Sequence, residues 1–161
     1  MKNYLIIITA FLAVSCKNAK RSYYNEAASA LRVSSIDFNP LEGKLISSGI
    51  DTVRHLMYTL YGNPVAANHA RFHSETDYPA GSVLSKVTWE QQPDPHWFGA
   101  NIPSSVSAVE VVRFNTGTDG IVRPRYRHYS GDGSGADAVL SQPEMDKRIN
   151  LILGIPASVM P

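Results

Sequence analysis

The chain has 161 residues, with 15 lysines and arginines against 14 aspartates and glutamates and a formal net charge of +1 at pH 7. This near-neutral balance argues against a nucleic-acid partner, because domains that bind nucleic acid are usually markedly basic. The length suits one domain with a sizeable core. A hydrophobic share of 43% is ordinary for a soluble globular domain.

The N-terminus carries the pattern of a secretory signal. Lys2 gives a short positive region, and residues 4–14 form an apolar stretch too short to span a bilayer comfortably. The following AVSC at 13–16 resembles the lipobox of bacterial lipoproteins. The resemblance implies cleavage before Cys16 and lipidation of that cysteine with acyl chains such as palmitate, which together give stable membrane anchoring. The alternative is an ordinary signal peptide with a chance cysteine.

Cys16 is the single cysteine of the chain. It therefore excludes both an intrachain disulfide and a Cys-x-x-Cys-His site for covalent haem. We predict a lipid-anchored protein of the bacterial cell envelope, on the outer membrane and facing the periplasm or the surface. Lys17, where an inner-membrane lipoprotein would carry aspartate, resembles the outer-membrane pattern. The expected organisation is a signal peptide over 1–15, a tether and N-terminal segment over 16–43 and a domain over 44–161.

Five stretches alternate apolar and polar residues in the way that predicts strands. They are 44–48, 51–61, 82–90, 106–114 and 121–129. A long loop over 91–102 is expected between the third and fourth. The fourth strand is predicted to place Val109 on one face and Val106, with Glu110, on the other. Pro124 makes the last an edge strand or a broken one.

A short helix is predicted over residues 64–72. Asn63 is a good N-cap, and a proline follows at the first helical position. We expect Val65, His69 and Phe72 to share one side of this helix.

A second helix is predicted near the C-terminus. Ser141 and Glu144 match a capping box, an apolar stripe follows at helical spacing, and Gly154 ends it. Several strands with few helices predict an α+β domain, in which an antiparallel β-sheet packs with a few helices and with this capped C-terminal helix.

Three segments, LYGN at 60–63, YPAGSVLSKVTW at 78–89 and DPHWFGANIP at 94–103, together resemble the cytochrome P-460 family. The resemblance covers roughly 44–161 and implies an antiparallel sheet packed with helices, often in dimers, so a homodimer is one expected partner. Haem-bearing members attach haem through Cys-x-x-Cys-His near the C-terminus. This chain has no cysteine there and no histidine after His128, so no covalent haem is expected. The alternative is non-covalent haem with a histidine as axial ligand.

His69 and His73 lie four residues apart at the end of the first helix, where both could face one metal ion with Glu75 as a third ligand. The pair lacks the rest of a metalloprotease motif. We favour the alternative of ordinary surface histidines and predict no metal.

His96, Trp97 and Phe98 follow one another in the long loop. They are candidates for a ligand pocket or a dimer interface. The alternative, which we favour, is a loop that folds its aromatic side chains back over the sheet. His96 is the histidine to test first, because loops between strands often carry function.

Two charged features complete the candidates. Arg123, Arg125 and Arg127 alternate along a strand, which puts three cations on one face, suited to an anionic ligand or partner; the alternative is a solvated edge protected by charge. Glu110 lies among apolar residues. Burial would raise its pKa and make it an acid or base, whereas the alternatives are an exposed face or an ion pair with an arginine.

From these features we predict a lipid-anchored protein whose domain binds a small ligand or partner; whether it is an enzyme stays open, and we favour a non-enzymatic role. The alternative is a redox enzyme or electron carrier that uses non-covalent haem or a histidine-bound metal.

Overall fold

The structure, a computed structural model, describes residues 25–29, 36–73, 76–131 and 140–158. The predicted signal peptide, Cys16 and Glu75 lie outside these ranges. Within them, no helix has the length and apolar character needed to cross a membrane.

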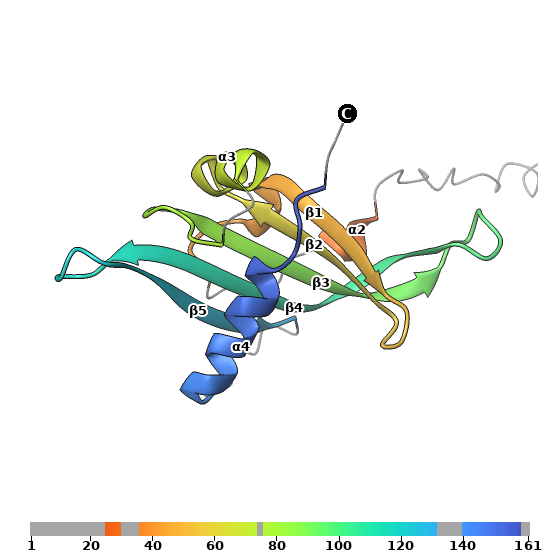
Figure 1. Cartoon of the computed structure of the whole chain (residues 1–161). Coiled ribbons are helices and arrows are strands. Elements are labelled where there is room, and N and C mark those ends of the chain that lie inside the picture. The colour runs from red at the N-terminus through yellow and green to blue at the C-terminus, as the bar shows by residue number, and fades with distance from the viewer. Residues whose placement is uncertain (1–24, 30–35, 74–75, 132–139, 159–161) are drawn as a thin grey trace, which may run out of the picture.

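One antiparallel sheet forms the centre of the structure, with its five strands side by side in chain order (Figure 1). The strands are β1 (Lys44–Asp51), β2 (Leu56–Gly62), β3 (Val83–Pro93), β4 (Asn101–Thr116) and β5 (Val122–Ser130). The predicted antiparallel sheet is confirmed. So is the edge position of the strand with Pro124, which lies in β5 opposite Phe114.

Helices lie on both faces of the sheet. The longest, α4 (Gln142–Leu153), crosses one face, and α3 (Pro64–Phe72) lies beside β1 and β2 (Figure 1). The short α2 (Glu26–Ser29) lies against β4, and a single 3-10 turn, η1 (Pro40–Glu42), precedes β1. The fold is therefore α+β in a broad sense but mostly β, with the predicted C-terminal helix present.

The sheet separates two apolar clusters. The cluster on the α4 face consists of Ile46, Leu60, Ala66, Ala67, Tyr78, Leu84, Val112, Phe114, Ile149 and Ile152. The cluster on the other face consists of Val87, Trp89, Val106, Val109, Val111 and Tyr129, covered by N-terminal residues that include Ala28, Ile36 and Phe38. Both faces of the central strands are thus buried, and part of the segment before residue 44 completes the core.

The predicted strand over 51–61 is wrong at its start. Asp51 ends β1, and its carboxylate accepts hydrogen bonds from the backbone N–H of Val53 at 3.1 Å and of Arg54 at 2.9 Å. This local side-chain turn competes with the extended chain. His55, with φ of 54°, completes the reversal into β2.

The region around the long loop also differs from the prediction. The loop is shorter than 91–102, because β3 continues to Pro93 and β4 begins at Asn101. The predicted face of Val106 is wrong. A register shift places Val106 opposite Trp89 and in the same cluster as Val109, since one extra residue in a strand reverses the alternation that follows it.

The helix α3 has the predicted bounds, and the side with Val65 and Phe72 is not the side that packs on the sheet. Val65 is 43% and Phe72 is 77% exposed, whereas Ala66 and Ala67 are buried. The helix approaches the sheet so closely that a Cβ on Gly62 would lie 3.1 Å from the Cβ of Ala66. Only small side chains fit at that distance, so the alanines face the core.

The helix α4 agrees with its prediction. The Glu144 carboxylate accepts hydrogen bonds from the backbone N–H of Ser141 at 3.0 Å and from its hydroxyl at 2.6 Å. Ile149 and Ile152, from the predicted stripe, are buried against the sheet.

Candidate functional site

Three ionisable side chains form one row across the middle of the sheet. Lys86 on β3 is opposite Glu110 on β4, and Glu110 is opposite His128 on β5. Residues directly opposite each other in an antiparallel pair point to the same face. Here it is the α4 face, since Arg148 from α4 reaches the same carboxylate.

Glu110 is the best-connected of these side chains. It is 4% exposed and accepts hydrogen bonds from Nζ of Lys86 at 3.0 Å, the hydroxyl of Tyr126 at 2.8 Å and Nη1 of Arg148 at 3.3 Å. Burial alone would raise the pKa of Glu110. The charge of Lys86, the two hydrogen bonds from Tyr126 and Lys86, and the charge of Arg148 together lower this pKa below its ordinary value of 4.5.

Although Glu110 is buried, its pKa does not rise as that interpretation required, and the alternative of a pair with an arginine is confirmed. The carboxylate is ionised at neutral pH, so it has no proton to give as a general acid. Its lone pairs are occupied by three donors, which makes it a fixed anion. Its role is to hold the surrounding cationic side chains in place.

A groove of about 690 Å³ opens above this row, between the β1–β2 turn and α4. We call it the α4 groove. Its volume falls within the range of roughly 300–1,000 Å³ typical of small-molecule sites. Its charged lining consists of Arg54, Lys86, Lys147 and Arg148 against Asp51, Glu110 and Glu144. The rest of its lining is Leu56, Tyr58, Thr88, Ser107, Ala108, His128, Leu140 and Leu151.

The Tyr58 ring forms one wall of the α4 groove. Tyr58 is opposite Gly49 on β1, and a Cβ at Gly49 would lie 2.4 Å from the tyrosine hydroxyl oxygen. The ring therefore lies flat over the glycine. Nζ of Lys86 lies 5.3 Å from the ring centroid, within cation–π range. The aromatic wall and the charged floor are thus in direct contact.

His128 is the histidine that borders the α4 groove. The residue is half-buried, and its Nδ1 atom is buried without a hydrogen-bond partner among the described residues. Buried polar atoms normally have partners. Its imidazole ring borders the groove, although the unpartnered Nδ1 itself is buried and not open to solvent.

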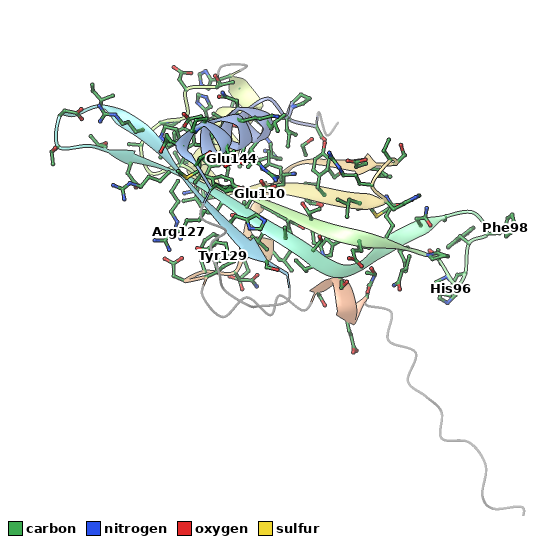
Figure 2. All side chains as sticks on the ribbon, turned by 90° about the horizontal axis from the view of Figure 1, so that it is seen from below. His96, Phe98, Glu110, Arg127, Tyr129 and Glu144 are labelled. Atoms are coloured by element: carbon green, nitrogen blue, oxygen red, sulfur yellow. The ribbon has the colours of Figure 1, made fainter. Side chains whose placement is uncertain are left out.

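The structure places the predicted aromatic triplet far from this groove. His96, Trp97 and Phe98 lie at the tip of the β3–β4 hairpin, and Figure 2 shows His96 and Phe98 at the end of a projecting arm, away from Glu110. Trp97 is 73% exposed and Phe98 is fully exposed. The favoured interpretation, in which the aromatic side chains fold back over the sheet, is therefore wrong.

The predicted arginines lie on the other face of the sheet. Arg125 is opposite Arg113 and Arg127 is opposite Val111, on the face of the second cluster. Arg123 forms an ion pair with Asp119 in the β4–β5 turn, so its charge is already matched.

A second groove lies beside β5, and its lining comes from both faces of the sheet. It has a volume of about 610 Å³ and includes Arg125 and Arg127 at the outer edge of β5. Both arginines are exposed. This placement agrees with the alternative of a charged, solvated edge strand.

The structure also shows how the two histidines of the predicted pair lie. The rings of His69 and His73 stack with their centroids 4.8 Å apart, and His69 also contacts the Tyr78 ring at 4.6 Å. Within the described ranges, no group of three or more His, Cys, Asp or Glu side chains is arranged to hold a metal ion.

Sequence reasoning identified Glu110 but missed its partners Lys86 and Arg148, and it missed His128. The signal available in the sequence was Lys86, a charged residue among the apolar residues of β3. It lies on one face of the strand and Trp89 lies on the other. Two charged residues at the centres of neighbouring strands suggest a pair if the register is known, and the register was not known.

No known protein-family model matches the chain, and no curated protein matches it. Fold and site together define a class: a mostly-β α+β domain with a charged, amphipathic groove beside its C-terminal helix.

Proposed function

We propose that the chain is a lipid-anchored protein of the bacterial cell envelope whose cytochrome P-460-like domain binds a small molecule in the α4 groove, without covalent haem. The observation that supports the proposal is the buried Glu110 cluster at the floor of a groove of about 690 Å³ that is open to solvent. A satisfied anion surrounded by cations gives a rigid polar floor, which is what orients a ligand in an otherwise apolar pocket.

The charges of the groove indicate the class of ligand. Four cationic side chains face three anionic ones. Lys86 and Arg148 bond to Glu110 and Arg54 pairs with Asp51, which leaves Lys147 as the cation of the described lining that is not paired within the groove. Leu56, Tyr58 and Leu151 supply an apolar wall. A molecule with one carboxylate or sulfonate and an apolar or aromatic body matches both parts. Three donors hold the Glu110 carboxylate in place as a structural anion, and this supports binding without catalysis.

Binding is tested with anilinonaphthalene sulfonate, a fluorescent amphipathic anion. Ala108→Phe narrows the α4 groove, whereas Ser105→Phe adds the same side chain at an exposed position of β4 outside the groove. We expect the first variant to weaken binding about tenfold or more, since it removes most of the buried contact, and the second to leave binding unchanged. Equal effects of the two variants would place the site elsewhere.

The anchor is tested separately by mass spectrometry of protein extracted from membranes. Acyl chains are expected on Cys16, and Cys16→Ser should remove the added mass. An unmodified N-terminus at another residue would refute the anchor without touching the groove.

A second candidate function, non-covalent haem binding, is supported by His128. Its ring borders the α4 groove, and Lys147 offers a cation for the carboxylates of such a group, whereas Arg54 and Arg148 are already paired with Asp51 and Glu110. A haem bound there would supply redox or ligand-binding chemistry at its iron. His128 would hold it, and the leucine and tyrosine side chains of the groove would exclude water.

Titration with hemin distinguishes the two candidates. The haem candidate expects a strong Soret band that His128→Ala abolishes and His96→Ala, at the remote hairpin tip, leaves unchanged. No band with the native chain, or a band indifferent to His128→Ala, would remove this candidate and leave the first one standing.

A further inference from the structure

The β3–β4 hairpin extends beyond the rest of the sheet as a two-stranded arm. β2 begins at Leu56, opposite Glu90, and β5 ends at Ser130, opposite Ala108. Past these positions β3 and β4 pair with each other through Gln91–Pro103, Gln92–Ile102 and Pro93–Asn101, and Gln91 is the last residue that still bonds to the β1–β2 side, through the carbonyl of His55 at 3.1 Å. Figure 1 shows the arm projecting at one end of the molecule.

The tip of the arm is an ordered turn. The Asp94 carboxylate accepts hydrogen bonds from the backbone N–H of His96 at 2.7 Å and of Trp97 at 3.3 Å, and the Asp94 N–H donates to the carbonyl of Ala100 at 2.9 Å. These bonds hold Trp97 and Phe98 outward, with exposures of 73% and 110%. The turn thus presents two large aromatic side chains to whatever lies beyond the tip.

The chain that leads to Cys16 meets the domain at the base of the same arm. Nδ2 of Asn25 donates to the carbonyl of Pro103 at 2.5 Å, and Nε1 of Trp89 donates to the carbonyl of Ala28 at 2.8 Å. Nine residue steps separate Asn25 from Cys16, a reach of at most about 30 Å. Five steps separate Pro103 from Phe98, roughly 17 Å of extended chain.

We propose that Trp97 and Phe98 are a second membrane contact of this protein, seated in the interface of the bilayer that holds the lipid on Cys16. The inference rests on the proposed anchor. Tryptophan favours the headgroup level of a membrane, where its ring is apolar and its N–H stays hydrated. The anchor lies within about 30 Å of the base of the arm, so the tip, roughly 17 Å beyond that base, can reach the same surface.

A lipid surface fits this tip better than a second copy of the chain. Two aromatic side chains bury about 150–250 Å² each, well below the roughly 800 Å² per partner of a stable protein interface. A narrow, convex tip also suits insertion between headgroups. Lys17, Lys20 and Arg21 lie in the sequence between the anchor and the domain, and basic residues there favour anionic lipid.

The two tryptophans make a direct test possible, because Trp89 is 5% exposed in the core while Trp97 is at the tip. The lipidated protein is placed in vesicles of phosphatidylcholine and phosphatidylglycerol, with or without bromine on the acyl chains. We expect brominated lipid to quench about half of the tryptophan emission, and Trp97→Phe to abolish that quenching.

The possible outcomes test the lipid anchor and the membrane contact of the tip separately. Protein that does not float with vesicles refutes the anchor. Protein that floats but whose Trp97 emission is the same in both kinds of vesicle overturns the membrane contact alone. A blue-shifted Trp97 emission without lipid that rises with protein concentration also overturns it, because the tip would then be covered by a second copy.

Discussion

Replacing Glu110 by glutamine removes one charge from the centre of the α4 groove and leaves its shape unchanged. The glutamine carbonyl can still accept from Tyr126, but its amide places N–H donors beside Lys86, which has donors only. The variant therefore tests the charge of the buried cluster and not its packing.

The size of the effect follows from the exposure of the partners. Lys86 is 22% exposed and its bond to Glu110 is 3.0 Å long, whereas Arg148 is 50% exposed at 3.3 Å. A hydrogen bond to a charged group contributes about 1.5–3 kcal/mol, and a half-exposed pair adds no more than about 1 kcal/mol. We expect Glu110→Gln to lower the free energy of unfolding by about 2–3 kcal/mol at pH 7, or roughly 10 °C in Tm.

The free energy of unfolding should depend on pH, and the direction of this dependence follows from the pKa of Glu110. The folded pKa of Glu110 lies below its ordinary value of 4.5, so the unfolded state takes up a proton first as the pH falls. The contribution of the ionised Glu110 is complete above pH 4.5 and is lost as the pH falls through the folded pKa. Urea denaturation from pH 7 to pH 3 should show the stability difference between the wild type and Glu110→Gln shrinking as the pH falls below 4.5.

A stability difference between the two proteins that stays constant over this pH range would refute the charge argument. A variant more stable than the wild type at pH 7 would show that the cost of burying Glu110 exceeds the attraction of its partners.

Three further variants test the fold around the site. Asn63→Ala removes the α3 cap and should cost about 2 kcal/mol in thermal or chemical unfolding, whereas Asn68→Ala, on the exposed side of the same helix, should be nearly neutral. Gly62→Ala should cost about 1–3 kcal/mol by overpacking, because the new Cβ would lie 2.6 Å from a buried isoleucine side chain. Trp89→Phe loses the hydrogen bond to Ala28 and should speed amide exchange in residues 25–29 about fivefold; unchanged exchange would show that this bond does not hold the N-terminal segment.

The sequence predicted those elements whose signals are local. A helix cap depends on a few residues that are neighbours in the sequence. The helices predicted to begin after Asn63 and Ser141 are both confirmed. The five strands were also found, because alternation along one strand is visible in the sequence. Where a side chain competes for the backbone, as Asp51 does, the alternation continued past the true end of the strand.

The site could not be predicted in the same way, because it depends on register. Lys86, Glu110 and His128 come from three strands and meet only because β3, β4 and β5 pair as they do. The bulge near Val106 and the short hairpin loops set that register. Neither is encoded in the residues that form the row, so one carboxylate was noticed and its partners were not.

Stability alone is a poor explanation for the buried charges. Well-packed apolar residues in place of a buried ion pair are often neutral or stabilising, and the same sheet face already carries Leu84 and Val112. The double variant Lys86→Met with Glu110→Leu is therefore expected to unfold within about 1 kcal/mol of the wild type. It should nevertheless bind anilinonaphthalene sulfonate about tenfold more weakly, because the groove loses the cation of Lys86 and the anion that positions Arg148. Denaturation and probe titration on the same preparation measure both quantities. A double variant that keeps full affinity would make the cluster a purely structural feature, and the α4 groove would then bind through its apolar wall alone.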